Sequence, residues 1–155
     1  MIPIKFFNPQ EKQELLKHLK EQFGVNEIPW NLAKWGKERI IILPKEISKK
    51  EIESIDDAGR VENIGLYFAK EDIDGVRLSI EGSNLLKNQI TKNIFEMDEK
   101  QLKNWMLGQQ LDVPTEKRGF LVMKYKDDFL GTGKASENRI TNFVPKSRRL
   151  KSKEI

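Results

Sequence analysis

The pattern of apolar and polar positions predicts a strand and then a helix at the start of the chain. Residues 2–7 alternate in a way that indicates a short strand. Asn8 is suited to capping the helix, Pro9 to its first position and Glu11 to completing a capping box, and Gly24 is suited to ending it. Four apolar residues lie between these signals at helical spacing: Leu15, Leu16, Leu19 and Phe23.

The next segment continues this first unit. Trp30 and Trp35 are expected in a loop or irregular stretch, where both pack against the core, and base stacking is the alternative role. Residues 39–43 form a β-branched run that predicts a buried strand, and the capping-box pattern of residues 48–51 predicts a short helix that closes near Gly59. Residues 1–59 are therefore expected to form a small α+β unit.

From residue 61 onward the pattern changes to short strands separated by polar turns. Two helices are expected among them, at residues 83–88 and 98–108, with Trp105 on the apolar face of the second. Strands are expected at residues 64–68, 76–80, 93–97, 119–125, 129–131 and 139–144. Closely spaced strands of this kind favour a small barrel.

The fold class that follows is α+β, in which the small N-terminal unit precedes a mixed β-barrel at residues 60–150. Residues 151–155 are assigned to a basic tail, and fraying is expected from Lys146 onward.

The residue counts exclude much enzyme chemistry. The chain has no cysteine and a single histidine, His18, so thiolate metal sites, cysteine nucleophiles and multi-histidine sites cannot be built from it. The glycine-rich residues 131–136 do not form a phosphate loop, because Asp128 and Ala135 replace a required Gly and a required Ser or Thr. They indicate a bend or bulge in a strand. No catalytic residue, metal ligand or cofactor is predicted.

The apolar runs also bear on location. The longest, at residues 40–43, is far too short to span a bilayer, and the first residues lack the pattern of a signal peptide. A cytoplasmic protein without a membrane partner is expected.

Charge is distributed unevenly along the chain. Residues 117–155 carry 11 Lys and Arg against 4 Asp and Glu, a balance of +7, whereas residues 1–116 carry 17 against 20, a balance of −3. A basic segment on a near-neutral body suits a polyanionic partner, and the alternative is a solvated tail. If the strands pair, the basic side chains should converge on one edge of the barrel. They are Lys124, Lys126, Lys134, Arg139, Lys146, Arg148 and Arg149.

Several stretches resemble a known family. Residues 74–83 (DGVRLSIEGS), 105–109 (WMLGQ), 118–125 (RGFLVMKY), 130–134 (LGTGK) and 139–149 (RITNFVPKSRR) are similar to segments of a PUA domain. The last of these most resembles the C-terminal RNA-binding region of Sun-family RNA cytosine methyltransferases. The resemblance covers residues 61–150 well, and residues 1–59 more loosely resemble the small pre-PUA domain.

The resemblance implies a PUA-type barrel that binds structured RNA, tRNA or rRNA, and presents it to a separate RNA-modifying enzyme or ribosome-assembly protein. It adds Arg77, Ser83 and Asn84 to the basic residues as RNA-binding candidates. The chain differs from the family in offering no Rossmann-like domain and no cysteine. A non-catalytic accessory factor in RNA modification or ribosome biogenesis is therefore predicted. A protein–protein adaptor whose barrel no longer binds RNA is the alternative, and an enzyme comes third.

Overall fold

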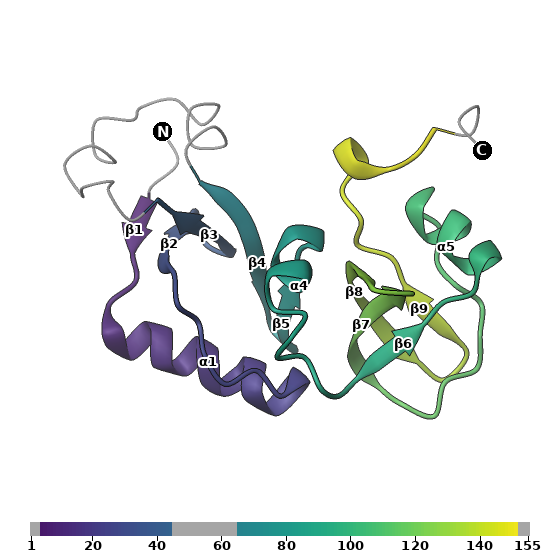
Figure 1. Cartoon of the computed structure of the whole chain (residues 1–155), viewed down its shortest axis with the longest axis horizontal. Coiled ribbons are helices and arrows are strands. Elements are labelled where there is room, and N and C mark those ends of the chain that lie inside the picture. The colour runs from purple at the N-terminus through teal and green to yellow at the C-terminus, as the bar shows by residue number, and fades with distance from the viewer. Residues whose placement is uncertain (1–3, 45–64, 152–155) are drawn as a thin grey trace.

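The computed structural model describes residues 4–44 and 65–151, which form two sheets with helices (Figure 1). The predicted α+β class is confirmed. The first sheet contains β1 (Ile4–Phe6), β2 (Asn31–Trp35), β3 (Arg39–Leu43), β4 (Leu66–Asp72) and β5 (Gly75–Leu78). The second contains β6 (Ile94–Glu96), β7 (Gly119–Tyr125), β8 (Asp128–Ser136) and β9 (Arg139–Thr141). The helices are α1 (Pro9–Phe23), α4 (Ile80–Leu85), α5 (Glu99–Met106) and the 3-10 turn η1 (Lys146–Arg148).

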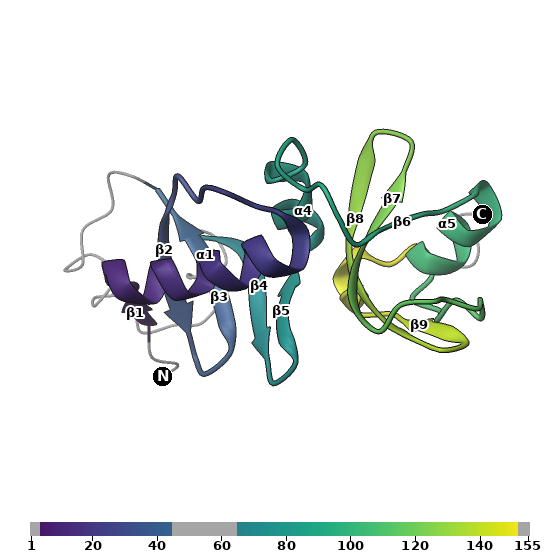
Figure 2. The same ribbon diagram turned by 90° about the horizontal axis from the view of Figure 1, so that it is seen from below.

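The first helix begins and ends at the predicted residues. The Asn8 side chain accepts a hydrogen bond from the Glu11 backbone, and the Glu11 side chain accepts one from the Asn8 backbone. Gly24 ends the helix with φ +82°, a conformation that favours glycine. The apolar stripe faces inward, since Leu19 and Phe23 are fully buried. Helix α1 therefore covers one face of the first sheet (Figure 2).

The first sheet is an antiparallel meander in the order β1-β2-β3-β4-β5. The irregular structure predicted around Trp30 and Trp35 was wrong for residues 31–35, which form β2 between β1 and β3. The strand was not recognised because residues on both of its faces are buried, so that hydrophobic alternation is weak. The helix predicted at residues 48–59 lies outside the described residues.

Strands β4 and β5 extend this first sheet, although the sequence assigned them to the second unit. The proposed boundary after residue 59 falls in the part of the chain that is not described, so the division into domains stays a prediction. The chain leaves β5 at Leu78, and α4 begins at Ile80 rather than at residue 83. Ser79 causes this early start, because its hydroxyl accepts a hydrogen bond from the Gly82 backbone and caps the helix.

The second sheet pairs β6 parallel to β7, and then β7, β8 and β9 antiparallel. Among the described strands, hydrogen bonding forms two open sheets rather than the closed barrel that the sequence predicted. The bulge predicted in the glycine-rich stretch is confirmed: the β7–β8 register shifts between Val122 and Lys124, and Gly131 has φ +81°. Helix α5 packs on this sheet through Trp105, which is fully buried.

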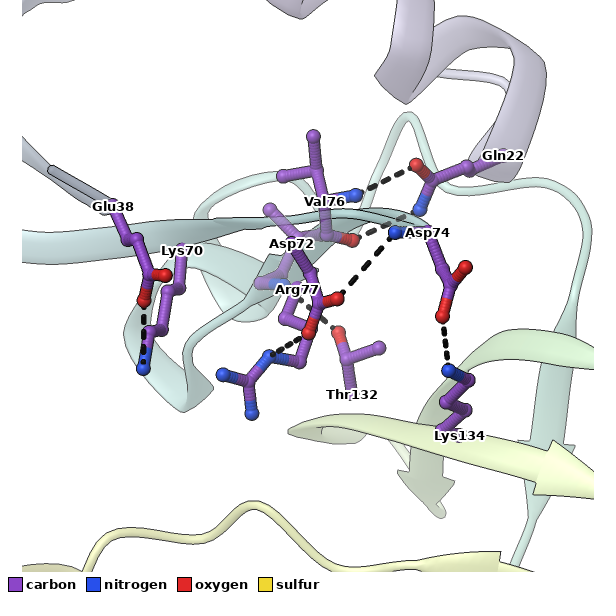
Figure 3. A network of polar contacts seen from close by, with 10 residues as sticks. Gln22, Glu38, Lys70, Asp72, Asp74, Val76, Arg77, Thr132 and Lys134 are labelled. Carbon is purple, nitrogen blue, oxygen red and sulfur yellow. Dashed lines mark hydrogen bonds and ion pairs between the residues drawn. The ribbon is translucent and has the colours of Figure 1, made fainter.

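The two sheets share one hydrophobic core. Phe120, Val122 and Phe129 of the second sheet belong to the same buried cluster as Leu19 and Phe23 of α1. Polar contacts cross the same junction (Figure 3). On the first-sheet side, the Gln22 amide of α1 bonds both backbone groups of Val76 in β5. Across the junction, the Leu78 backbone donates to Thr132 Oγ1 at 3.0 Å, and Asp74 forms an ion pair with Lys134. These contacts fix the β4–β5 hairpin against β8.

The C-terminal segment is ordered against the fold rather than frayed from Lys146. The Leu150 backbone donates to the Met106 carbonyl at 2.7 Å, and Arg149 Nε donates to the Val144 carbonyl at 2.8 Å. The prediction of fraying was therefore wrong as far as Leu150, because the segment continues along the side of the second sheet and then meets α5 (Figure 1). No helix in the described ranges is long and apolar enough to cross a membrane.

Candidate functional site

A groove lies where the first sheet meets the C-terminal segment. It consists of a hollow of about 390 Å³ and a smaller one of about 30 Å³, and Tyr67, Ser79, Ile80 and Pro145 line both. Six arginine and aromatic residues, Tyr67 among them, line the groove, and we call it the arginine groove. Those that define it are Trp35, Arg39, Tyr67, Arg77, Phe143 and Arg148.

One wall of the groove comes from the strands of the first sheet. Trp35 of β2 pairs in register with Arg39 of β3, which places both side chains on one face of the sheet, away from α1. The Arg39 guanidinium lies 5.4 Å from the Trp35 ring centre and 5.6 Å from the Tyr67 ring centre. Arg39 is exposed. These contacts hold a cation between two aromatic rings at the surface.

Trp35 and Tyr67 each contribute a hydrogen-bond donor to this wall, an indole N–H and a phenol O–H. The Trp35 side chain is 9% exposed, and its indole N–H has no acceptor within the described part of the chain. Burial raises the pKa of the Tyr67 phenol, Arg77 and Arg39 oppose the rise, and the Glu81 carboxylate adds to it. The phenol therefore stays protonated at neutral pH and keeps its capacity to donate a hydrogen bond.

Arg77 links the groove to the junction of the sheets. Its guanidinium lies 4.0 Å from the ring centre of Phe143. Its Nε is 3.6 Å from an Asp72 oxygen, beyond hydrogen-bond distance, and the two terminal nitrogens point away from that carboxylate (Figure 3). Arg77 was predicted from the sequence, and the structure places it in the groove with its side chain 15% exposed.

The opposite side of the groove holds a carboxylate beside an arginine. Glu81 lies in the first turn of α4, and Arg148 Nη1 lies 2.9 Å from its Oε1 atom. The helix is held close to β4 because the Ser79 backbone and hydroxyl both donate to the Phe68 carbonyl. The position of Glu81 is therefore fixed by the cap of its helix.

Two of the predicted RNA-binding residues, Ser83 and Asn84, form hydrogen bonds within the fold. Ser83 is fully buried, its hydroxyl donates to the Ile80 carbonyl, and it accepts from the Gly131 backbone. The Asn84 side chain bonds both backbone groups of Phe129. These bonds fasten α4 to β8, and a role of either side chain in RNA binding stays a prediction.

The predicted convergence of basic residues on one edge is not found. Lys126 lies in the turn before β8 and Arg139 begins β9 after it, so the nine residues of β8 separate them by roughly 30 Å. Lys124 is 3.9 Å from Glu96, and Lys134 forms the ion pair with Asp74. Strand pairing brings the ends of β8 to opposite ends of the sheet, which sequence proximity does not reveal.

The remaining basic candidates lie near the C-terminus. Lys146 is exposed, and Arg148 lines the groove with half of its side chain exposed. Arg149 packs beside Gly108, where a Cβ would lie 2.4 Å from its Nε atom. Removing Arg148 and Arg149 together would therefore disturb packing as well as charge.

Sequence reasoning did not select Arg39, Tyr67 or Glu81 as site residues, and for Trp35 it favoured packing over base stacking. The available signal was the spacing of Trp35 and Arg39 around a glycine-containing turn, which is typical of a hairpin. No group of three or more residues able to hold a metal ion occurs in the ranges 4–44 and 65–151.

Comparison with known proteins found a family model that matches the C-terminal part of the chain and several similar proteins. Residues 92–150 match the family model described as the PUA domain of the methyltransferase RsmF. The chain is 21% identical over 145 residues to ribosomal RNA small subunit methyltransferase F of Vibrio cholerae, and 24% identical over 148 residues to the enzyme of that name from Shewanella oneidensis. Each comparison covers 93% of this chain, but only 30% and 29% of the two relatives.

The matched region runs from just before β6 to just after η1, and so includes the whole second sheet, α5 and Arg148. The motifs that suggested the resemblance at residues 105–109, 118–125, 130–134 and 139–149 all lie inside it. The chain therefore resembles the PUA-bearing region of Sun-family ribosomal RNA methyltransferases, which confirms the resemblance predicted from its motifs and indicates RNA binding.

Proposed function

We propose that this chain is a non-catalytic RNA-binding protein that holds structured tRNA or rRNA in the arginine groove. The observation that carries the proposal is the alternation of cations and rings there: Arg39 between Trp35 and Tyr67, and Arg77 against Phe143. Arginine suits phosphate because its planar guanidinium can donate two parallel hydrogen bonds, and aromatic rings can stack on unpaired bases. A groove offering both kinds of group matches single-stranded or looped RNA better than a regular duplex.

Arg39 and Lys146 are the exposed cations through which phosphates would be bound. Arg39 lines the groove, and Lys146 follows Pro145, which lines both hollows. Lys126 and Arg139 are not among the residues that line the groove, so they stay secondary candidates.

Replacing Arg39 and Lys146 with methionine should weaken the binding of many RNAs alike. Each lost phosphate contact lowers the number of counterions released, so the slope of log K against log salt should flatten by about 0.7 per contact on single-stranded RNA. Filter binding of bulk tRNA and rRNA fragments over a salt series measures this slope. Methionine keeps an unbranched apolar side chain and removes the charge and the hydrogen-bond donors.

The matched control is the pair Lys17→Met and Lys20→Met. Both lysines are exposed on α1, across the first sheet from the groove. The control variant should keep the wild-type slope, or lose the same small amount at every salt concentration. Equal slopes for the two double variants would show that the groove is not where phosphates bind, and absence of RNA retention by the wild type would favour the adaptor alternative.

We further propose that this chain binds RNA without modifying it and assists a separate RNA-modifying enzyme or ribosome-assembly protein. The chain spans less than a third of the methyltransferases that it resembles, and it contains no cysteine. Incubated with RNA and labelled S-adenosylmethionine, the purified chain should transfer no methyl group. Reproducible incorporation of label above a no-protein blank would show that the chain is catalytic.

A further inference from the structure

The arginine groove contains a feature that phosphate binding does not require. Glu81 lines it, with 29% of its side chain exposed, and its negative charge opposes the approach of a phosphate. Its carboxylate is held 2.9 Å from Arg148, which itself is half exposed. The pair presents a hydrogen-bond acceptor directly beside a hydrogen-bond donor at the surface of the groove.

That arrangement complements the edge of a nucleobase. Cytosine, adenine and guanine each carry an exocyclic amino group, a donor that suits a carboxylate, next to a ring nitrogen or carbonyl that can interact with a second group. Uracil lacks the amino group. A carboxylate beside an arginine therefore distinguishes bases in a way that a purely basic surface cannot.

The walls of the groove provide the other half of a base site. The Tyr67 ring lies in the same hollow as the Glu81 carboxylate, and Trp35 lines that hollow with a buried indole N–H that has no acceptor in the described ranges. Aromatic faces stack on any base that has left its own stack. The hollow measures about 390 Å³, near the lower end of the range for small-ligand sites, which suits one nucleotide and not a helix.

We propose that the arginine groove takes one unstacked nucleobase bearing an exocyclic amino group, with Glu81 accepting from that amino group and Arg148 donating to the neighbouring acceptor. This inference rests on the proposed RNA binding and deepens it. Phosphate contacts then set the affinity for RNA in general, and the Glu81–Arg148 pair sets a preference for which nucleotide is unstacked.

The variant Glu81→Gln tests the inference on the full chain. The probes are dodecamers of cytidine, adenosine and uridine, and a uridine dodecamer with one central cytidine. The wild type should bind the cytidine and adenosine dodecamers about tenfold more tightly than the uridine dodecamer, since one good base contact is worth about that factor. The single cytidine should recover several-fold of this difference, because the groove holds one base.

Glutamine removes a negative charge and replaces one acceptor oxygen with a donor. Glu81→Gln should therefore lower the affinity for cytidine and adenosine dodecamers and raise it slightly for the uridine dodecamer, while the salt slope changes little. The charge-matched control is Glu137→Gln, an exposed residue in the turn between β8 and β9. The control should shift all four probes by the same factor.

The outcomes separate the two proposals. If Glu81→Gln and Glu137→Gln change all probes equally, the base site is refuted while RNA binding stands. If the wild type already binds cytidine, adenosine and uridine dodecamers with equal affinity, the base site is refuted by the same experiment. If the wild type retains none of the probes and no tRNA, the proposed function fails, and the base site fails with it. Thermal melting of each variant confirms that it is folded.

Discussion

Replacing Trp105 with alanine should lower the free energy of unfolding by about 3–5 kcal/mol. The indole is the largest fully buried side chain in the described structure, and its N–H donates to the Leu130 carbonyl at 2.9 Å. Truncation leaves a cavity between α5 and the second sheet and a carbonyl without its partner. Chemical denaturation and a lower melting temperature, by roughly 6–20 °C, measure the loss.

The control on the same helix is Lys103→Ala. Lys103 is exposed, so its replacement should change the free energy of unfolding by less than about 0.5 kcal/mol. If Trp105→Ala and Lys103→Ala had the same free energy of unfolding, Trp105 would not pack between α5 and the second sheet in solution.

Replacing Gly82 with alanine should cost about 3 kcal/mol of stability, at the upper end of the range for overpacking. A Cβ at Gly82 would lie 2.2 Å from the Phe68 carbonyl oxygen, a backbone atom, and 3.0 Å from a carbon of the Phe68 ring. That carbonyl also accepts the hydrogen bonds of Ser79. Relief of the clash therefore requires α4 to move away from β4, and the cap of the helix is lost with it.

Leu85→Ala is the comparison for Gly82→Ala, because Leu85 lies on the same helix with 45% of its surface exposed. Its effect on the denaturation midpoint should be much smaller. Gly82→Ala should also weaken the preference for cytidine and adenosine dodecamers over the uridine dodecamer under conditions where it stays folded, since the displaced helix carries Glu81 out of the groove. A variant as stable as the wild type would mean that α4 and β4 approach each other less closely than the structure shows.

Local signals in the sequence were sufficient to predict the helices that carry capping boxes. Asn8 with Glu11, and Asp98 with Gln101, each satisfy free backbone groups within three residues, so the information is local. Strand β2 was harder, because Leu32 and Ala33 are both buried, one on each face of the sheet. Its neighbours β1 and β3, and not its own pattern, determine that it is a strand.

The candidate site was predicted only in part. The reason is that its residues lie far apart in the sequence and meet only in the folded chain. Arg77 and Arg148 are 71 residues apart, and both line the groove with Tyr67 as a shared neighbour of the two hollows. Ser83 and Asn84 were chosen from a resemblance in sequence, and the structure shows that both also bond the backbone of β8, at Gly131 and Phe129. Lys126 and Arg139 are close in sequence, but the length of β8 separates them.

The shared core has a consequence for how such proteins can be rearranged. The family match begins at residue 92, yet Phe120, Val122 and Phe129 are buried against side chains that precede it. A gene fusion that transferred residues 92–150 alone would carry an uncovered apolar face into its new context, and such faces promote aggregation. A segment that is to keep its core covered must therefore be longer than the 92–150 family match. It must also include α1 and the first sheet, which α1 covers.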